Sequence, residues 1–377
     1  MDELERRIVT RKFLTRLWNL ENDERPGFMI GYVGPRVKGG KPVRSALFAT
    51  EGPDTVRDRL LNPGKFLQAQ LIEIKEQSML RGDFVPSLCP ALGVIGIPSA
   101  FGCEVTWFEN NLPAVRPAID NEPDQVFDLH NPSIINGELG RILEYTRYFI
   151  QETNRRYPIR LTDIQGPLDS AALIMGHNNF LLAMHTNPDA AHHLLQLVTN
   201  LTIEFTRTQR NIVTTYGVEF IPSMFQPWMP DGWGISISND ECVSISSEMH
   251  DEYSIPYLNQ ISDAFGGIYL HSCGNWQHQF ASLEKVRNLR GLEFGASETP
   301  YEKVLDHFGG QVVIAPRVGF HREVKFASMT DYVRKILNAS KTCRGLFVNV
   351  DITNGLIDEN WLETNLDEIY NLFDIGD

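Results

Sequence analysis

Short apolar runs alternate along this chain with longer segments of helical periodicity. Eight runs have the length and composition of β-strands: GFMIGYV, GDFVPSL, PIRLTDIQ, GVEFIPSM, GGIYLHSC, GLEFGA, QVVIAP and GLFVNVD. Each run is followed by a segment whose apolar residues recur every three or four positions, which is typical of an amphipathic helix. Eight strands that alternate with helices predict an α/β protein in which the strands close into a single (β/α)8 barrel, the TIM barrel.

A doubly wound open sheet is the competing architecture. Such a sheet carries a glycine-rich phosphate loop directly after its first strand when it binds a dinucleotide. Here the first strand continues into GYVGPRVKGG, which has glycines but neither the dinucleotide-binding spacing nor a helix directly after them. We therefore expect the barrel.

The ends and loops define the expected domain organisation. An amphipathic helix is predicted over residues 3–20, so residues 1–25 form an N-terminal helical extension and residues 26–377 form the barrel. Residues 89–136 contain six prolines and show no sustained period, which predicts a long irregular loop after an early strand. A second irregular loop is expected after the fourth strand. Long insertions of this kind usually carry function.

Capping signals place the ends of several helices. Periodicity predicts one helix from about residue 56 to residue 79, and another that begins at Asn187-Pro188. Ser246 or Ser247 is expected to cap a helix that runs to about residue 265. The segment SETPYEKV predicts a capping box with Thr299 as its cap.

Composition and charge narrow the classes of protein that this chain can be. It has 377 residues, of which 42% are hydrophobic and 22% charged, as expected of a globular chain. A formal net charge of −14 argues against nucleic acid or an anionic membrane as a partner. Residues 1–20 lack the apolar core of a secretion signal, and five scattered cysteines argue against a disulfide framework, so we expect a cytoplasmic protein.

The segment HSCGNW, at the end of the fifth strand, is the strongest candidate for chemistry. Side chains alternate along a strand, so His271 and Cys273 project to the same side. An imidazole nitrogen and a thiolate sulfur suit zinc, and Gly274 permits a sharp turn beside them. A satisfied polar residue and an ordinary buried cysteine would give the same pattern. The barrel favours a site, because its catalytic groups lie at the C-terminal ends of the strands.

Other polar side chains are expected at the same end of the barrel. Asp163 follows the third strand, Arg317 and His321 follow the seventh, and Asp351 ends the eighth. Asp163, Arg317 and Asp240, which lies in the loop after the fourth strand, are the candidate catalytic residues. A carboxylate at either aspartate position could orient a ligand or a ligating histidine, or could simply cap a loop.

Two tryptophans lie in the loop after the fourth strand. Trp228 and Trp233 could stack on a flat macrocycle, or they could anchor the loop. They are therefore the candidate cofactor-binding residues.

Three segments resemble the uroporphyrinogen decarboxylase superfamily: residues 163–189 (DIQGPLDSAALIMGHNNFLLAMHTNPD), residues 245–261 (ISSEMHDEYSIPYLNQI) and HSCGN. The resemblance covers the chain from about residue 26 to its end. The third segment is similar to the branch that contains the zinc-dependent methylcobalamin:coenzyme M methyltransferases. This resemblance implies that His271 and Cys273 are zinc ligands. The third ligand of that branch is a cysteine near the end of the last strand, where this chain has Asp351 instead. Asp351, Cys242 and His321 are therefore the candidates for the third ligand.

The resemblance implies a zinc-dependent methyltransferase. It would move a methyl group from methylcobalamin or a corrinoid protein to a thiol or a related acceptor. Tetrapyrrole decarboxylation is the second possibility. Decarboxylases of the superfamily carry an arginine-rich pattern on the loop after the first strand, where this chain reads GYVGPRVKGG and offers only Arg36 and Lys38 within that segment. A non-catalytic barrel that binds a corrinoid or tetrapyrrole is the third. The oligomeric state stays open, with a homodimer as one candidate.

Overall fold

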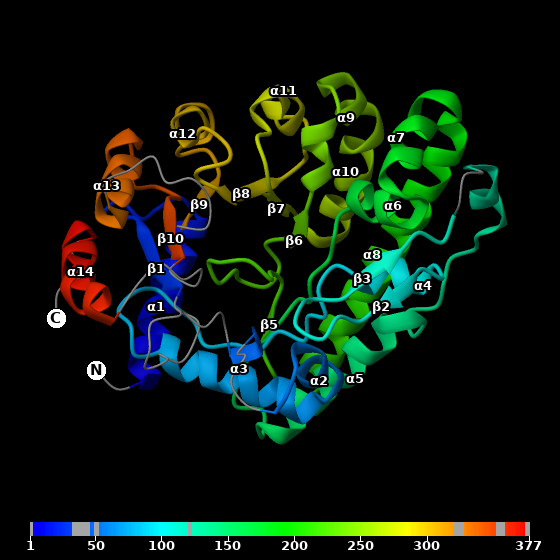
Figure 1. The fold of residues 1–377 in the computed structure, drawn as a ribbon. Coiled ribbons are helices and arrows are strands. Elements are labelled where there is room, and N and C mark those ends of the chain that lie inside the picture. Colours follow the sequence, from blue (N-terminus) through cyan, green and yellow to red (C-terminus); the bar gives the residue numbers. More distant parts are fainter. Residues whose placement is uncertain are drawn as a thin grey trace.

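Parallel strands surrounded by helices form the centre of the molecule (Figure 1). The computed structural model describes residues 3–31, 46–48, 53–119, 123–319, 328–351 and 359–373. Six strands form one sheet in the order β1-β10-β9-β8-β7-β6, and every neighbouring pair is parallel. These strands are β1 (Gly27–Gly31), β6 (Ile235–Ser238), β7 (Ile268–Ser272), β8 (Leu289–Gly295), β9 (Val313–Gly319) and β10 (Phe347–Asp351).

Backbone hydrogen bonds extend the sheet beyond β6. The short strands β4 (Ile159–Arg160) and β5 (Phe220–Ile221) pair in parallel. The N–H of Ser236, in β6, donates to the carbonyl oxygen of Pro222, directly after β5, at 2.9 Å. The chain of paired strands therefore runs from β10 through β6 and β5 to β4.

Residues 83–88 connect β4 back to β1. The N–H of Asp83 donates to the carbonyl oxygen of Phe28, in β1, at 2.7 Å. Leu88 forms a parallel bridge with Ile159, in β4. Backbone hydrogen bonds thus pass around a ring of parallel segments, and the predicted barrel is confirmed. The run GDFVPSL takes the place of the second strand: its residue Asp83 pairs with β1 and its residue Leu88 pairs with β4.

The strand β6 differs from the prediction, because it lies in the loop that was expected to be irregular. It pairs with β7 along its whole length, from Ile235 opposite Ile268 to Ser238 opposite His271. Since β6 runs parallel to β7, the chain has to return from the C-terminal end of β5 to the N-terminal end of the barrel before β6 begins. This return segment, residues 222–234, is important for the site.

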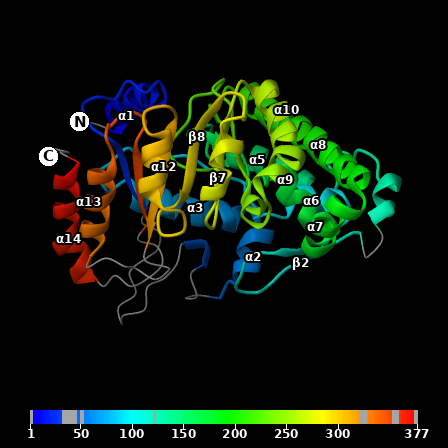
Figure 2. The same ribbon diagram turned by 90° about the horizontal axis from the view of Figure 1, so that it is seen from above.

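Helices cover the outside of the ring, as Figures 1 and 2 show. The end of α14 (Glu359–Leu372) packs against the first strand, where the ring of Phe373, directly after the helix, stacks on the ring of Phe28 with centroids 4.0 Å apart. No helix within the described parts of the chain has the length and apolar character needed to cross a bilayer. The helices are α2 (Val56–Leu61), α3 (Pro63–Gln77), α5 (Gly137–Glu152), α6 (Pro167–Met175), α7 (His177–Thr186), α8 (Pro188–Thr215), α9 (Ser247–Tyr253), α10 (Ile255–Phe265), α11 (Phe280–Leu283), α12 (Tyr301–Phe308), α13 (Met329–Ala339) and α14 (Glu359–Leu372).

Two predicted helices are each divided in the structure. The helix expected over residues 56–79 is α2 followed by α3, because Pro63 lacks an N–H and the side chain of Asn62 caps the second helix. The helix expected to run to residue 265 divides into α9 and α10, with Pro256 in the first turn of α10. The predicted caps are confirmed for Asn187 and for Ser246, whose side chains accept hydrogen bonds from the first turns of α8 and α9.

The irregular region at residues 89–136 contains only short elements. They are α4 (Gly96–Ala100), the antiparallel strands β2 (Glu104–Thr106) and β3 (Ala114–Arg116), and the 3-10 helix η2 (Pro123–Asp128). This region packs against α5, α6 and α8 outside the ring.

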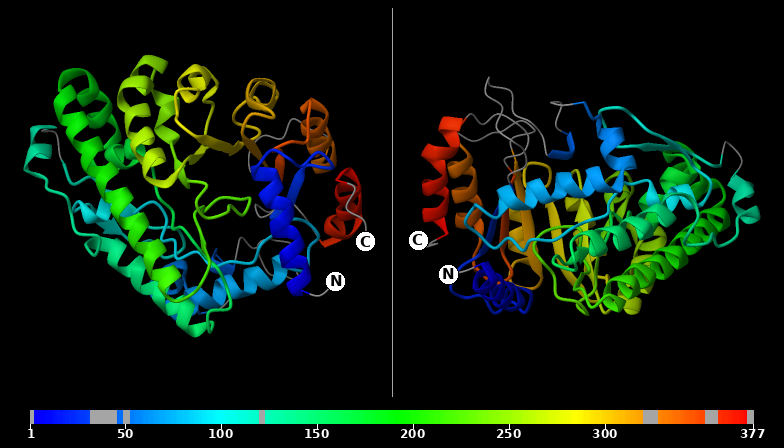
Figure 3. Two further views of the ribbon diagram at one scale, coloured as in Figure 1. Left: turned by 180° about the vertical axis from the view of Figure 1, so that it is seen from behind. Right: turned by 90° about the horizontal axis from the view of Figure 1, so that it is seen from below.

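The N-terminal helix α1 (Glu3–Trp18) covers the N-terminal end of the barrel, in front of the strands in the left view of Figure 3. Its residues Leu14 and Leu17 are completely buried. They belong to one apolar cluster with Tyr269 and Phe347, which lie at the starts of β7 and β10. The opposite end of the barrel, where the strands terminate, holds the candidate site.

Candidate metal site

Three potential metal ligands converge at the C-terminal end of β7. The Nε2 atom of His271 lies 3.3 Å from the Sγ atom of Cys273 and 3.6 Å from the Oδ1 atom of Asp240. The ligand atoms of these three residues all lie within 4.8 Å of one another. His271 and Cys273 come from the strand end, and Asp240 begins the 3-10 helix η3 (Asp240–Ser244), which follows β6.

The donor set and its spacing fit a zinc ion. With bonds of about 2.0–2.1 Å to nitrogen and oxygen and about 2.3 Å to sulfur, a tetrahedral ion separates its nitrogen and sulfur ligands by roughly 3.6 Å and its nitrogen and oxygen ligands by roughly 3.4 Å. The observed separations of 3.3 Å and 3.6 Å are close to these values. A tetrahedral ion held by these three residues would keep its fourth position for a substrate.

Glu293 orients the imidazole of His271 from the neighbouring strand β8. The Nδ1 atom of His271 forms a short hydrogen bond with Oε2 of Glu293, and both side chains are almost completely buried. Burial opposes protonation of His271, but the charge of Glu293 and the hydrogen bond to Cys273 outweigh it and raise the pKa of His271 well above its ordinary value. A carboxylate on the second nitrogen of a ligating histidine fixes the orientation of the ring.

The sequence prediction missed Glu293, although a signal was present. It is the one charged residue in the run GLEFGA, and a lone carboxylate in a buried strand needs a partner. Arg317, a candidate catalytic residue, lies beside it: the Nε atom of Arg317, in β9, is 3.9 Å from Oε1 of Glu293. The structure therefore places Arg317 behind the histidine, at the carboxylate that orients it.

A buried carboxylate holds the backbone at Asp240. The two oxygens of Asp169 accept hydrogen bonds from the N–H groups of Asp240 and Glu241, at 2.9 and 2.8 Å. Burial and the charge of Asp240 raise the pKa of Asp169 well above its ordinary value. The Oδ1 atom of Asp240 also accepts from the N–H of Cys273 at 2.6 Å, so the two candidate ligands are directly connected. Asp169 was not predicted as a site residue.

Hydrogen bonds with two side chains hold the turn after Cys273. Gly274 has a φ of +75°, which glycine adopts without strain. Its N–H donates to Oε2 of Glu298 at 2.9 Å, and its carbonyl oxygen accepts from the hydroxyl of Thr299 at 2.7 Å. The predicted capping box is therefore wrong: Pro300 is the N-cap of α12, and the hydroxyl of Thr299 binds the turn of the metal site instead.

Asp163 and Phe225 complete the surroundings of the histidine. Asp163 lies in the charge environment of His271 and Asp240, and burial raises its pKa. Its Oδ1 atom accepts from the side-chain amide of Gln165 at 3.2 Å. The ring of Phe225 stacks on the imidazole, with centroids 4.6 Å apart and an interplanar angle of 23°. Phe225 was not predicted, because nothing in the sequence shows that its segment enters the barrel.

The structure does not bring Cys242 into this group. Its Sγ atom lies 3.5 Å from the hydroxyl of Ser272, and the residue is 1% exposed. Ser272 alternates with His271 and Cys273 along β7, so its side chain points to the opposite face of the strand and Cys242 lies behind the site. Burial raises the pKa of the Cys242 thiol above its ordinary value.

The other candidates for the third ligand are less fully described. Asp351 is the last residue of β10, opposite Gly31 and Gly319 in the neighbouring strands. His321 lies outside the described residues. Both remain predictions, whereas Asp240, expected as a catalytic residue, has the position of a ligand.

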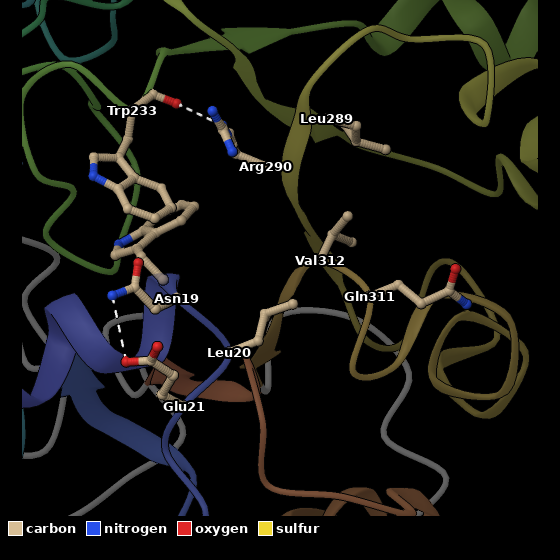
Figure 4. Close-up of a pocket in the computed structure, with 9 residues that line it drawn as sticks. Asn19, Leu20, Glu21, Trp233, Leu289, Arg290, Gln311 and Val312 are labelled. Carbon is tan, nitrogen blue, oxygen red and sulfur yellow. Dashed lines mark hydrogen bonds between the residues drawn. The ribbon is translucent and has the colours of Figure 1, made fainter.

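The candidate cofactor-binding tryptophans lie at the opposite end of the barrel, which corrects their predicted role at the site. The indole N–H of Trp228 donates to Glu219 at 2.7 Å, and its carbonyl oxygen accepts from Trp18, in α1, at 2.8 Å. Trp233 lines a cleft of about 370 Å³ between the end of α1 and the starts of β8 and β9, where Arg290 donates to its carbonyl oxygen (Figure 4). Both tryptophans lie at the N-terminal end of the barrel because the chain returns to that end between β5 and β6.

A family model and the solved structure of a methyltransferase agree with this architecture. A family model, Uroporphyrinogen decarboxylase (URO-D), matches residues 89–315. A solved structure of a methyltransferase from Methanosarcina mazei is similar with a TM-score of 0.68 and 14% identity, over 97% of this chain and 98% of that chain. A B12-independent methionine synthase from Shewanella sp. W3-18-1, in complex with selenomethionine, gives a TM-score of 0.48 and 13% identity, over 91% of this chain and 95% of that chain. No curated protein matches the sequence. At 14% identity, the likeness to the Methanosarcina mazei structure concerns the fold alone.

Proposed function

This chain belongs to the uroporphyrinogen decarboxylase (URO-D) family, and from that premise we propose that it is a zinc-dependent methyltransferase. The methyl group would pass from a methyl-corrinoid, either methylcobalamin or a corrinoid protein, to a thiol or a related acceptor. The observation that carries the proposal is the convergence of His271, Cys273 and Asp240 at the C-terminal end of the barrel, with Glu293 behind the histidine. The likeness in fold to a methyltransferase is consistent with it.

The side chains of the site have separate roles in this proposal. When bound, a zinc ion supplies Lewis acidity that favours the deprotonated form of a thiol substrate at neutral pH. His271, Cys273 and Asp240 would hold that ion. Glu293 keeps the Nε2 atom of His271 directed at the other two ligands by binding its Nδ1 atom. Asp163 interacts electrostatically with His271 and Asp240. Its raised pKa suits a carboxylate that accepts the proton of the thiol.

The proposed transfer balances without an added oxidant or reductant. The substrate thiol gives its proton to Asp163 or to solvent, and the sulfur attacks the methyl carbon of the donor. In this proposal a carbon–sulfur bond would form as the cobalt–carbon bond of the donor substrate breaks, and the electron pair of that bond would leave with the corrinoid. The chain contributes orientation and charge, and its own atoms form no bond with the methyl group.

Metal analysis and a thiol assay test the proposal together. The purified protein should contain about one zinc per chain, and it should demethylate methylcobalamin in the presence of a suitable member of a panel of thiols. Cys273→Ser should remove both properties, whereas Cys343→Ser, at a half-buried cysteine before β10, should change neither. Zinc binding without demethylation of any donor would contradict the methyltransferase proposal.

Two alternatives predict different outcomes of the same experiment. A tetrapyrrole decarboxylase would release carbon dioxide from uroporphyrinogen and would not respond to loss of Cys273. A non-catalytic carrier would bind a corrinoid equally well before and after removal of the metal by a chelator. Neither alternative explains why nitrogen, sulfur and oxygen donors lie at ligand spacing.

A further inference from the structure

A short piece of the chain lies inside the barrel, directly beneath the candidate metal site. Figure 1 shows the segment between β5 and β6, in green, in the middle of the ring of strands, and residues 223–226 are part of this segment. Their backbone cannot pair with a neighbouring strand there, so its polar groups need other partners.

Arg160 supplies those partners from β4. Its Nη1 atom donates to the carbonyl oxygens of Ser223 and Phe225, at 3.0 and 3.1 Å, and its Nη2 atom donates to the side-chain oxygen of Gln226 at 3.1 Å. Its Nε atom donates to the hydroxyl of Ser87 at 2.7 Å. Arg160 is 4% exposed, so these hydrogen bonds are shielded from water. Tyr269 adds a hydrogen bond from its hydroxyl to the carbonyl oxygen of Gln226.

The fixed segment places the ring of Phe225 against the imidazole of His271. Hydrogen bonds to Glu293 and Cys273 restrain the Nδ1 and Nε2 atoms of His271, but bonds at these two nitrogens leave the ring free to turn about the line that joins them. A second ring stacked at 4.6 Å and 23° blocks that movement on one face. The two contacts together direct the Nε2 atom at Cys273 and Asp240.

We infer that Phe225 is a positioning residue for His271, and that Arg160 fixes Phe225 in place for this role. The inference rests on the proposed function, because positioning matters if His271 is a metal ligand. Phe225 would not touch the metal. Its effect would be to hold the imidazole in the orientation that ligation requires, before any metal arrives.

Substitution of Phe225 tests the inference. Phe225→Leu keeps an apolar side chain of similar size but removes the flat ring, and Phe225→Tyr keeps the ring. We expect Phe225→Leu to weaken zinc binding by roughly threefold to tenfold in a chelator competition, and Phe225→Tyr to restore the affinity of the unsubstituted protein. The absorption spectrum of the cobalt(II)-substituted protein should change in the first variant and not in the second.

A matched control is available on the outside of the barrel. Phe127 also lies beside a histidine, with its ring centroid 5.3 Å from that of His193, and it is 47% exposed. Phe127→Leu should leave both zinc affinity and the cobalt spectrum unchanged. This control separates the position of Phe225 from a general effect of losing an aromatic ring beside a histidine.

A metal-independent measurement separates failure of this inference from failure of the proposed function. In the metal-free protein with carbon-13-labelled histidine, the ring proton of His271 should lie upfield because of the ring current of Phe225, and Phe225→Leu should move it downfield. If the unsubstituted protein binds zinc and Phe225→Leu binds it equally well, the positioning role is overturned. If the unsubstituted protein binds no zinc, the proposed function fails, and an unmoved His271 resonance in Phe225→Leu would then overturn the inference too.

Discussion

Replacing Glu293 with glutamine would remove the negative charge behind His271 while almost preserving the shape of the side chain. The side chains of His271 and Glu293 are 7% and 3% exposed, so water and salt screen their interaction only weakly. Glutamine can still accept a hydrogen bond from the Nδ1 atom. The substitution therefore isolates the contribution of the charge from that of the contact.

The expected loss of zinc affinity follows from the role of such a carboxylate. Substitution of the partner of a ligating histidine typically weakens metal binding about 10- to 100-fold, or ~1.4–2.8 kcal/mol. Because glutamine keeps an acceptor oxygen, we expect the lower half of this range, about 10- to 30-fold. The effect should also depend on pH. The charge of Glu293 contributes to the raised pKa of His271, so a proton should compete with zinc for the imidazole up to a higher pH in the unsubstituted protein than in Glu293→Gln. Proton competition should be weaker in Glu293→Gln. The zinc affinity of the unsubstituted protein, divided by that of Glu293→Gln, should therefore increase as the pH rises.

Chelator competition at several pH values between about 6.5 and 9 measures this ratio, a range that begins at the ordinary pKa of histidine. A matched control is Glu284→Gln, because Glu284 lies 2.8 Å from His307 in a pair whose side chains are 59% and 37% exposed. Exposed pairs of this kind contribute little, so the control should bind zinc with unchanged affinity. Equal zinc affinities for Glu293→Gln and the unsubstituted protein across the whole pH range would refute the orienting role of Glu293.

Three further predictions concern the third ligand, the loop that holds it and a buried histidine. Asp240→Asn should lower zinc affinity at least tenfold, whereas Cys242→Ala should not change it; the reverse result in a zinc titration would make Cys242 the ligand. Asp169→Asn places an amide N–H against one of the two backbone N–H groups that Asp169 binds, and it should lower the free energy of unfolding by about 1–3 kcal/mol. Urea unfolding of the metal-free protein measures this loss. An unchanged urea midpoint would show that Asp169 does not stabilise the backbone at Asp240. Burial lowers the pKa of His250 from 6.5 to about 4, so its neutral form is favoured in the folded state and its contribution to stability is fully present above pH 6.5. This contribution should disappear as the pH falls from 6.5 to about 4, by as much as about 3 kcal/mol, and His250→Gln should show a smaller loss of stability over this range.

The sequence was sufficient to predict the barrel and the pair of residues at the end of its fifth strand. Both depend on local patterns: apolar runs define strands, and the alternation of side chains along a strand puts His271 and Cys273 together. The structure brings their ligand atoms to 3.3 Å. Asp240 was named, but not as a ligand, because its position depends on the route of β6 and on two hydrogen bonds to Asp169.

The residues that the sequence did not reveal depend on contacts between distant segments. Phe225 reaches His271 only because Arg160, 65 residues earlier, binds the carbonyl oxygen of Phe225. Trp228 and Trp233 were placed near the site because their loop follows a strand that ends there. The chain instead crosses to the other end of the barrel before β6, since a strand parallel to β7 has to begin at that end.

The packing of α1 and residues 223–226 determines how molecules can reach His271. Leu14 and Leu17 of α1 close one end of the barrel, and Arg160 holds the inner segment above them. Within the described residues, the N-terminal end of the barrel is thus closed to molecules that would reach the imidazole. In the proposed reaction, the thiol and the methyl donor would therefore both approach His271 from the C-terminal end of the barrel.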